Sequence, residues 1–278
     1  MLACLELGDP HGSPVIYCHG YPGSRLEARL AAGAAGRLRL RLLAPDRPGA
    51  GGSTFRPGRS LGAWAADAAE LADHFRLERF SIIGVSGGGP YALACAASIP
   101  ARLNAVALVS ALAPVAGRRA REDMIPSNRL MLALAMRCPP LARGMVHLLA
   151  RLIRRYPDFY FVRMMRGIPE VDRRVLEDPA YHALLLESMV EAVRQGGYGP
   201  ARELTLFARR WDFSLDQVRI PVRIWQGLSD NIVPAAMARD LAAALPGSEC
   251  HYLSGEGHFS LIYRRHEDIL ADLMRAGS

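Results

Sequence analysis

The stretch FSIIGVSGGGPYALACA, residues 80–96, joins an apolar run to a serine and three glycines, and then to an alanine-rich segment. The apolar run is typical of a buried parallel strand, and the alanine-rich segment has the composition of a helix packed on a sheet. Gly84 and Gly88, two residues before and after Ser86, allow a sharp turn that holds the serine in a strained conformation with its hydroxyl exposed. The sequence therefore predicts a strand, a turn and a helix, with Ser86 at the turn.

The pattern Gly84-Val85-Ser86-Gly87-Gly88 is weak evidence alone, because glycine is common in this chain (26 of 278 residues) and ordinary strand-to-helix junctions also use it. A nucleophilic serine needs a base, a group that orients the base, and donors for the oxyanion. The role of the turn therefore depends on what the rest of the chain supplies.

The overall composition limits which classes of protein this chain can belong to. Half of the 278 residues are apolar, which is enough for one large domain or a domain with an insertion. The N-terminal segment has no basic region followed by an apolar run, so it does not resemble a signal peptide, and no segment has the ~20 apolar residues of a membrane helix. We expect a cytoplasmic protein without a membrane span.

Cysteine, histidine and lysine usage exclude several chemistries. The five cysteines and eight histidines show no C-x-x-C, H-x-H or H-E-x-x-H spacing, which argues against a disulfide scaffold and a metal site. All 34 basic residues are arginine, so Schiff-base catalysis, a pyridoxal phosphate anchor and a P-loop lysine are excluded. The sequence predicts neither a metal nor a cofactor.

The formal net charge of +7 lies in the middle of the chain, where residues 114–210 hold 17 arginines against 10 acidic residues. A cationic surface there could attract an acidic substrate, an anionic membrane or nucleic acid. Solvated outer faces of arginine-rich helices are the favoured alternative, because no aromatic interleaving or basic stripe accompanies the charge. We expect a small-molecule substrate and no nucleic acid, and both a monomer and a homodimer remain open.

Strand-like and helical segments alternate in two parts of the chain, which predicts an α/β fold with a mostly parallel, doubly wound sheet. The expected strands are 15–19, 41–45, 80–85, 105–110, 221–227 and 249–253, and the expected helices are 25–35, 61–75, 90–98, 234–245 and a final one from 266. Between the two parts, helical patches occur without strand candidates, at 124–137, 141–156 and 178–195. We predict a core of residues 1–113 and 206–278 and a helical insertion of residues 114–205.

Two polar residues follow late strands of the predicted sheet. Asp230 lies just past the strand at 221–227, and His258 just past the next strand. The carboxyl ends of parallel strands meet at one edge of a sheet, so Ser86, Asp230 and His258 can come together there. The sequence therefore supplies a candidate base and a candidate orienting group.

Other polar residues are weaker candidates for the site. Arg25 could face the site and bind a carboxylate, although a solvated helix start is the favoured interpretation. We interpret His19 as holding its loop by hydrogen bonding. Weaker alternatives for the acid and the base are Asp46, Asp212, Asp216, His251 and His266.

Two further motifs precede the elbow: His19-Gly20-Tyr21-Pro22 follows an early strand, and DRPGAGGS spans residues 46–53. The first is similar to an H-G-x-P oxyanion loop and the second to a D-x-x-G-x-G-x-S turn. With the G-x-S-x-G elbow and the chain order Ser, Asp, His, the sequence resembles the α/β-hydrolase fold superfamily over nearly its whole length. The type it resembles carries a helical cap inserted after the sixth strand.

This resemblance implies a role for each matching residue. Ser86 would be the nucleophile, His258 the general base and acid, and Asp230 the group that orients the imidazole. The backbone N–H groups of Tyr21 and Gly87 would form the oxyanion hole. Residues that would support the site are His19, Gly20, Gly84 and Gly88.

The residues at these positions narrow the reaction. Haloalkane dehalogenases and epoxide hydrolases of this fold need aspartate in place of Ser86, and its hydroxynitrile lyases need a lysine. The leading hypothesis is hydrolysis of a small to medium, largely apolar carboxylic ester, lactone or thioester through an acyl-serine intermediate. The alternatives are a carbon–carbon bond hydrolase of the meta-cleavage-product type and a ligand-binding protein that does not turn over.

Overall fold

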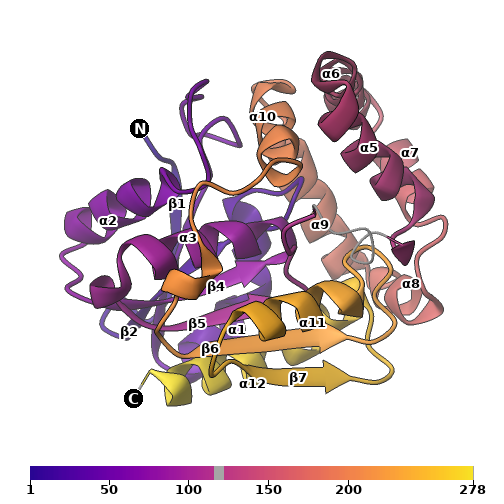
Figure 1. Cartoon of the computed structure of the whole chain (residues 1–278). Coiled ribbons are helices and arrows are strands. Elements are labelled where there is room, and N and C mark those ends of the chain that lie inside the picture. The colour runs from indigo at the N-terminus through magenta and orange to yellow at the C-terminus, as the bar shows by residue number, and fades with distance from the viewer. Residues whose placement is uncertain (116–121, 278) are drawn as a thin grey trace.

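A seven-stranded sheet forms the centre of the computed structural model, which describes residues 1–115 and 122–277 (Figure 1). The strand order is β1-β3-β2-β4-β5-β6-β7; β1 is antiparallel to β3, and the other neighbouring pairs are parallel. The strands are β1 Cys4–Gly8, β2 Ser13–Cys18, β3 Leu40–Pro45, β4 Phe80–Val85, β5 Leu103–Val109, β6 Val222–Gly227 and β7 Glu249–Leu253. The mostly parallel sheet is as predicted.

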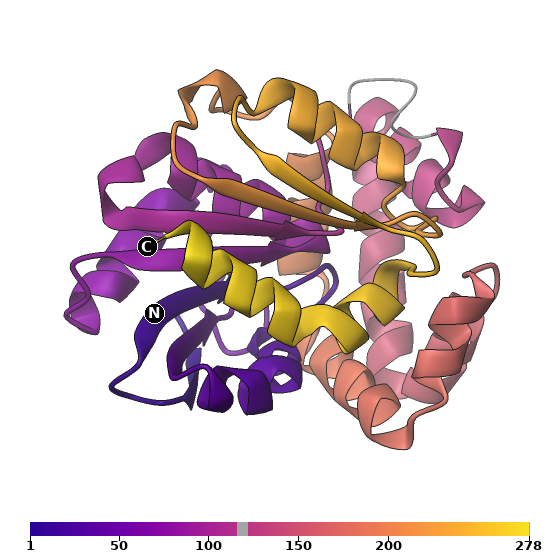
Figure 2. The same cartoon turned by 90° about the horizontal axis from the view of Figure 1, so that it is seen from below.

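Helices cover both faces of the sheet, which confirms the doubly wound arrangement (Figures 1 and 2). One face is covered by α2 Trp64–His74, α3 Gly89–Ser98 and α11 Ala235–Ala244, and the other by η1 Arg25–Ala31, α1 Ala32–Arg37 and α12 His258–Ala276. Two short 3₁₀ helices, η3 Pro100–Arg102 and η4 Leu215–Gln217, complete this part of the chain.

Strand β4 shows why the sheet needs a helix layer on each side. All six of its residues are buried. Phe80 and Ile82 belong to the apolar cluster on one face, while Ile83 and Val85 belong to the cluster on the other. Burying a side chain of this size stabilises the fold by about 1.5–3 kcal/mol. The apolar run therefore specifies a central strand with both faces covered.

Among the described residues between β5 and β6, the regular elements are helices, joined by loops. They are α5 Pro126–Arg137, α6 Pro139–Arg155, α7 Pro157–Met164, α8 Glu170–Leu176, α9 Pro179–Ala192, α10 Tyr198–Phe207 and η4. Four of these helices begin with proline, whose fixed φ and missing N–H suit the first helical position. The insertion follows the fifth of the seven strands, where the resemblance implied the sixth.

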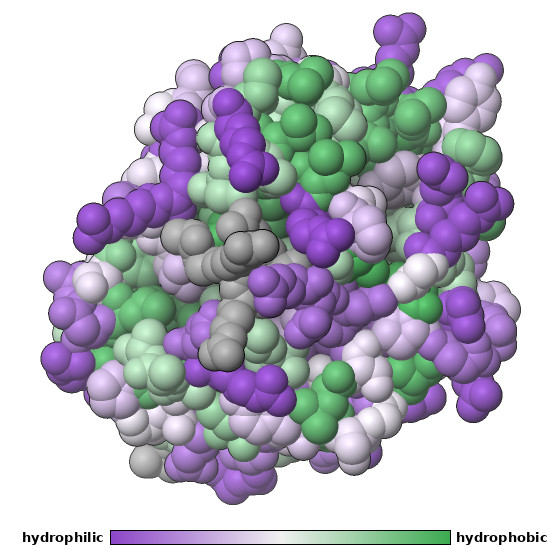
Figure 3. All heavy atoms as spheres, turned by 45° about the vertical axis from the view of Figure 1, so that its right-hand side comes forward, coloured by the Kyte–Doolittle hydropathy of each residue, from purple (hydrophilic) through white to green (hydrophobic). Residues whose placement is uncertain are grey.

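Helix α6 explains where the excess arginines lie. Ala142, Val146, Ala150 and Ile153 are buried on its inner face, with the spacing of an amphipathic helix. The exposed outer face carries arginines, and Figure 3 shows hydrophilic side chains interspersed with apolar surface on this side of the molecule. Exposed arginines on this helix are Arg143, Arg151, Arg154 and Arg155. These arginines form a solvated outer face, as favoured from the sequence.

Some elements differ from the sequence expectation. Strand β1 was not predicted, and α12 begins at His258 instead of residue 266. The short helices α7, α8 and α10 were not predicted individually. Within residues 1–115 and 122–277, no helix has the length and apolar character needed to cross a membrane.

Candidate active site

Ser86 lies at the turn between β4 and the short helix η2 Ser86–Gly88, which leads into α3. Its φ of 52° is in the left-handed region, where a residue with a side chain is strained. A methyl group on Gly84 would lie 2.8 Å from the Gly88 carbonyl oxygen and 2.9 Å from Ala92 Cβ, and one on Gly88 would collide with the Cys18 carbonyl. Glycine on both sides of Ser86 is therefore a steric requirement of this turn.

Asp230 and His258 are joined by a hydrogen bond of 2.8 Å between Oδ2 and Nδ1. Both side chains are buried. Asp230 Oδ1 accepts from the backbone N–H groups of Ile232 at 2.9 Å and Val233 at 2.8 Å, which fixes the carboxylate in the loop after β6. The structure thus orients the imidazole with Nδ1 toward a carboxylate and leaves Nε2 for another partner.

The pKa of His258 is raised above its ordinary value of 6.5. Burial of the ring lowers the pKa, but the charge and hydrogen bond of Asp230, with smaller contributions from Asp172 and Glu27, outweigh burial. The surroundings of this ring therefore stabilise an imidazolium, the form that a general base adopts after it accepts a proton.

Ser86 and His258 line the same cavity, which has a volume of about 140 Å³. Within the described residues, no hydrogen bond joins Ser86 Oγ to the imidazole. Such contacts are often long in the absence of substrate and shorten in the reacting complex. The hydroxyl and the imidazole therefore line one cavity without a hydrogen bond between them.

Tyr21 and Gly87 lie side by side next to the serine. A methyl group on Gly87 would lie 2.7 Å from Tyr21 Cβ, and both residues line a second cavity that also contains Ser86. In the part of the chain that the structure describes, neither backbone N–H donates to another protein group. The start of α3 adds a partial positive charge close by. Two adjacent donors without acceptors are what an oxyanion requires.

The chain is similar in sequence to known proteins. The model of the alpha/beta hydrolase family matches residues 15–273. The chain belongs to the alpha/beta hydrolase family. It is 25% identical to the uncharacterized hydrolase YcgS of Bacillus subtilis (strain 168) over 254 residues, which cover 89% of this chain and 85% of that protein.

Solved structures share the fold of this alpha/beta hydrolase. A thermophilic esterase from Thermogutta terrifontis, solved with malate bound, has a TM-score of 0.71 and 23% identity, over 100% of this chain and 94% of that one. The enol-lactonase from Burkholderia xenovorans LB400 has a TM-score of 0.74 and 18% identity, over 99% of this chain and 96% of that one. These structures show the fold, and the family match makes this chain an alpha/beta hydrolase.

His19 holds the loop that carries Gly20 and Tyr21. Its Nδ1 donates to the Gly20 carbonyl at 2.9 Å, and its Nε2 accepts from the Arg47 backbone N–H at 3.4 Å. Burial, together with the nearby Arg47 charge, lowers the pKa of His19 to about 3, so the ring is neutral. A neutral ring with one donor and one acceptor fits both contacts.

A cluster of buried charged residues also holds the loop of His19 and Gly20. The sequence did not predict this cluster. Arg47 donates to the carbonyls of His19 and Gly20, the latter at 2.9 Å, and pairs with Glu203 on α10. Glu203 also accepts from Arg59 at 3.2 Å and from the Tyr91 hydroxyl at 3.0 Å. Burial raises the pKa of Glu203, but Arg47 and Arg59 outweigh it and hold the pKa at about 2.

Asp172, on α8, caps the helix that carries the candidate base. Its carboxylate accepts the backbone N–H groups of His258 at 2.9 Å, Phe259 at 3.0 Å and Ser260 at 2.8 Å, the first three residues of α12. A carboxylate satisfies the unpaired donors of a helix N-terminus and interacts well with its dipole. The side chain is fully buried. Asp172 therefore ties the inserted helices to the backbone of His258.

We expect Asp172→Asn to lower kcat/KM for an ester substrate by about tenfold at neutral pH, because an amide cannot accept all three backbone donors. The lost negative charge also lowers the pKa of His258. A base with a lower pKa stays neutral at lower pH, so the acid limb of the kcat/KM profile moves to lower pH. The measurement is kcat/KM against pH, with Asp268→Asn, an exposed change on α12, the helix that begins at His258, as control. An unmoved acid limb contradicts this role.

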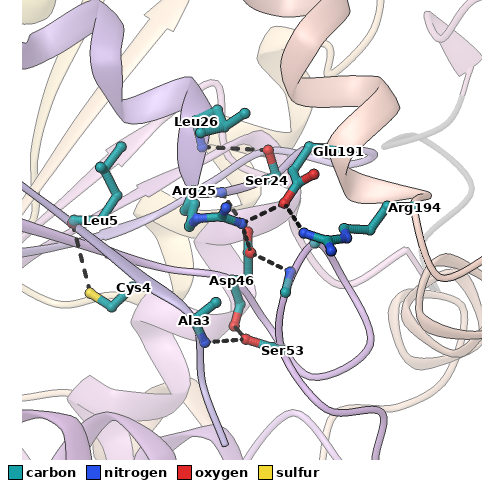
Figure 4. Close-up of polar contacts among 12 residues, drawn as sticks. Ala3, Cys4, Leu5, Ser24, Arg25, Leu26, Asp46, Ser53, Glu191 and Arg194 are labelled. Atoms are coloured by element: carbon teal, nitrogen blue, oxygen red, sulfur yellow. Dashed lines mark hydrogen bonds and ion pairs between the residues drawn. The ribbon is translucent and has the colours of Figure 1, made fainter.

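Arg25 joins the core to the inserted helices (Figure 4). Its guanidinium pairs with Asp46 and, at 2.7 Å, with Glu191 on α9. Its side chain is 21% exposed, so the solvated helix start favoured from the sequence is wrong. Asp46 also accepts the backbone N–H groups of Arg25 at 2.7 Å and Gly52 at 2.9 Å, and therefore holds its turn.

The remaining sequence candidates lie away from the two cavities that contain Ser86. Asp212 accepts the Gly62 backbone N–H at 2.9 Å, and Asp216 lies in η4. His251 lies in β7, 3.0 Å from Asp272, and His266 lies inside α12. Over residues 1–115 and 122–277, no group of three or more His, Cys, Asp or Glu residues could hold a metal ion.

Proposed function

We propose that this alpha/beta hydrolase is a serine hydrolase that cleaves a small to medium, largely apolar carboxylic ester, lactone or thioester. Its triad would be Ser86, His258 and Asp230. The observation that carries the proposal is the 2.8 Å hydrogen bond between Asp230 and His258 beside a cavity that Ser86 shares. We also propose that residues 114–205 form a cap over a core of residues 1–113 and 206–278.

The reaction begins when His258 Nε2 takes the proton of Ser86 Oγ as the oxygen attacks the substrate carbonyl. The oxyanion forms beside the backbone N–H groups of Tyr21 and Gly87, each worth roughly 3 kcal/mol in such a site. His258 then gives its proton to the leaving oxygen or sulfur, which breaks the bond to the carbonyl carbon. Water, activated by His258, attacks the acyl-serine, and Ser86 recovers its proton.

The size and lining of the second cavity support a small apolar acyl group. Its volume is about 170 Å³. An engineered apolar cavity of about 150 Å³ binds benzene, so an acyl group of that size fits. Apolar residues from α5, α6 and α10 contribute to the wall, among them Met131, Leu132, Val146, Ala150 and Leu204.

We expect the wild-type enzyme to hydrolyse p-nitrophenyl butyrate with an acid limb whose midpoint lies above pH 6.5. His258 must be neutral to accept the Ser86 proton, and its pKa is raised above 6.5, so activity falls as pH drops through that raised value. The measurement is kcat/KM across the pH range. Absence of hydrolysis for esters, lactones and thioesters of this size range would overturn the proposed function.

A further inference from the structure

Two cavities meet at Ser86, and they differ in what else they contain. Gly87 lines only the cavity of about 170 Å³, and His258 lines only the cavity of about 140 Å³. Ser86 and Tyr21 line both. A substrate carbonyl at Ser86 would therefore extend one arm into each cavity.

If the proposed function holds, the chemistry decides which cavity takes the leaving group and which takes the acyl chain. The imidazole must reach the leaving oxygen to protonate it, so the leaving group extends into the cavity that His258 lines. The acyl chain then occupies the cavity lined by Gly87. We call these the leaving-group cavity and the acyl cavity.

Glu27 places a carboxylate in the leaving-group cavity, close to the nucleophile. A methyl group on Gly20 would lie 3.0 Å from Glu27 Oε2 and 3.7 Å from Ser86 Cβ, so the two side chains flank one point. Glu27 accepts the Tyr17 hydroxyl and the Gly20 backbone N–H, each at 3.0 Å. Its two hydrogen-bonding partners are thus neutral groups.

This carboxylate differs from other acidic groups around the site. Glu203 and Glu191 each pair with arginines, whereas within the described residues no ion pair reaches Glu27. Burial raises the pKa of Glu27, although the hydrogen bonds from Gly20 and Tyr17 and the more distant charges of Arg47 and His258 oppose the rise. A buried carboxylate without an ion-pair partner is costly, and a ligand that brings a donor or a positive charge relieves that cost.

We propose that Glu27 is a specificity-determining residue that selects esters whose leaving alcohol carries a protonated amine. The remainder of the leaving-group cavity is largely apolar, so the preferred alcohol is a short alkyl amino alcohol. Apolar residues that line it include Leu30, Leu184, Leu185, Met189 and Phe259. An anionic leaving group meets repulsion from Glu27, and an apolar one leaves the carboxylate unpaired.

The test compares butyrate esters of two alcohols with nearly the same shape, 3-methylbutanol and 2-(dimethylamino)ethanol. The amine is tertiary, so the acyl group cannot migrate to nitrogen, and its protonated form donates one hydrogen bond. We expect wild-type kcat/KM to be about tenfold or more higher for the amino ester, in line with a hydrogen bond to a charged group. The butyrate of 4-hydroxybutanoate, whose leaving group is anionic, should be the poorest of the three.

The variant that isolates the charge is Glu27→Gln, which keeps the shape and an acceptor for the Gly20 N–H. We expect it to remove most of the preference, measured as the ratio of kcat/KM for the amino ester to that for the 3-methylbutyl ester. The ratio cancels any general effect on catalysis, because both substrates share the acyl group and the triad. Glu187 is exposed on α9 and pairs with Arg29, so Glu187→Gln should leave the ratio unchanged.

Each outcome decides between explanations. A wild-type ratio near one, or a ratio that Glu27→Gln does not lower, overturns the role of Glu27 while p-nitrophenyl butyrate hydrolysis still supports the proposed function. If the wild type hydrolyses neither p-nitrophenyl butyrate nor these esters, the proposed function itself fails. Should Glu27→Gln not fold, product inhibition of the wild type decides: 2-(dimethylamino)ethanol must inhibit more strongly than 3-methylbutanol.

Discussion

We expect Ser86→Ala to lower kcat/KM for p-nitrophenyl butyrate by about 10⁴-fold or more. The variant keeps the imidazole, the carboxylate and the backbone donors, and loses only the oxygen that forms the acyl intermediate. What remains is the catalysis that an oxyanion hole and substrate binding supply to a direct attack by water. The measurement is initial rate against substrate concentration for purified wild type and variant, with the fold of both checked by circular dichroism.

Ser81→Ala is the matched control, because it removes a buried serine hydroxyl from β4, the strand that leads to Ser86. Ser81 Oγ has no hydrogen-bond partner among the described residues, so its loss leaves the fold and kcat/KM close to wild type. A Ser86→Ala enzyme with at least a tenth of wild-type activity would exclude the acyl-serine mechanism.

We expect Glu203→Ala to lower the free energy of unfolding by about 3–5 kcal/mol. The reason is the charge left behind: Arg47 and Arg59 are buried, and without Glu203 they face each other with no carboxylate between them. Removing one partner of a buried ion pair is far more costly than removing an exposed one. Equilibrium unfolding in denaturant measures the loss, and midpoint and slope must be fitted together.

Glu170→Ala is the control for this variant. Glu170 also contacts two arginines, Arg173 and Arg174, but its side chain is 57% exposed against 4% for Glu203. We expect a much smaller loss of stability, and equal losses for the two variants would contradict the role of burial. The pKa of Glu203 is depressed to about 2 from an ordinary 4.5, so its stabilisation is present above pH 4.5 and is lost as the pH falls toward 2.

The parts of the fold that the sequence predicted are those with strong local patterns. Buried parallel strands such as β4 are nearly continuous apolar runs. Asp230 closely follows β6, whose sequence VRIWQG is mostly buried, so its place at the sheet edge can be predicted. Strand β1 is a short edge strand paired only with β3. Its five residues are too few to show a clear alternation of apolar and polar side chains. Edge strands are commonly short, which leaves little pattern to find.

The supporting residues could not be predicted, because their partners are distant in the chain. Asp172 bonds to backbone groups 86–88 positions later, and Glu203 pairs with an arginine 156 positions earlier. Both lie on short helices, α8 and α10, which have too few turns for a clear apolar period. No local sequence pattern around either residue indicates the buried donors from which its carboxylate accepts hydrogen bonds.

Glu27 shows how a local pattern can mislead. Residues 24–27 read Ser-x-x-Glu, the sequence of a capping box, in which the glutamate would accept the Ser24 backbone N–H. In the structure that N–H donates to Ser188 Oγ at 3.0 Å, and Glu27 turns instead to Tyr17 and Gly20. The contact with α9 replaces the local one and frees the carboxylate to line the leaving-group cavity.

The most direct test of the central claim is covalent labelling with a fluorophosphonate, which reacts with a serine only when a base activates it and donors stabilise the phosphoryl oxygen. Mass spectrometry of the digested wild-type protein should place one adduct on Ser86, and His258→Ala should prevent its formation. An unlabelled Ser86 in folded protein that hydrolyses p-nitrophenyl butyrate, or an adduct on another serine, would contradict the account.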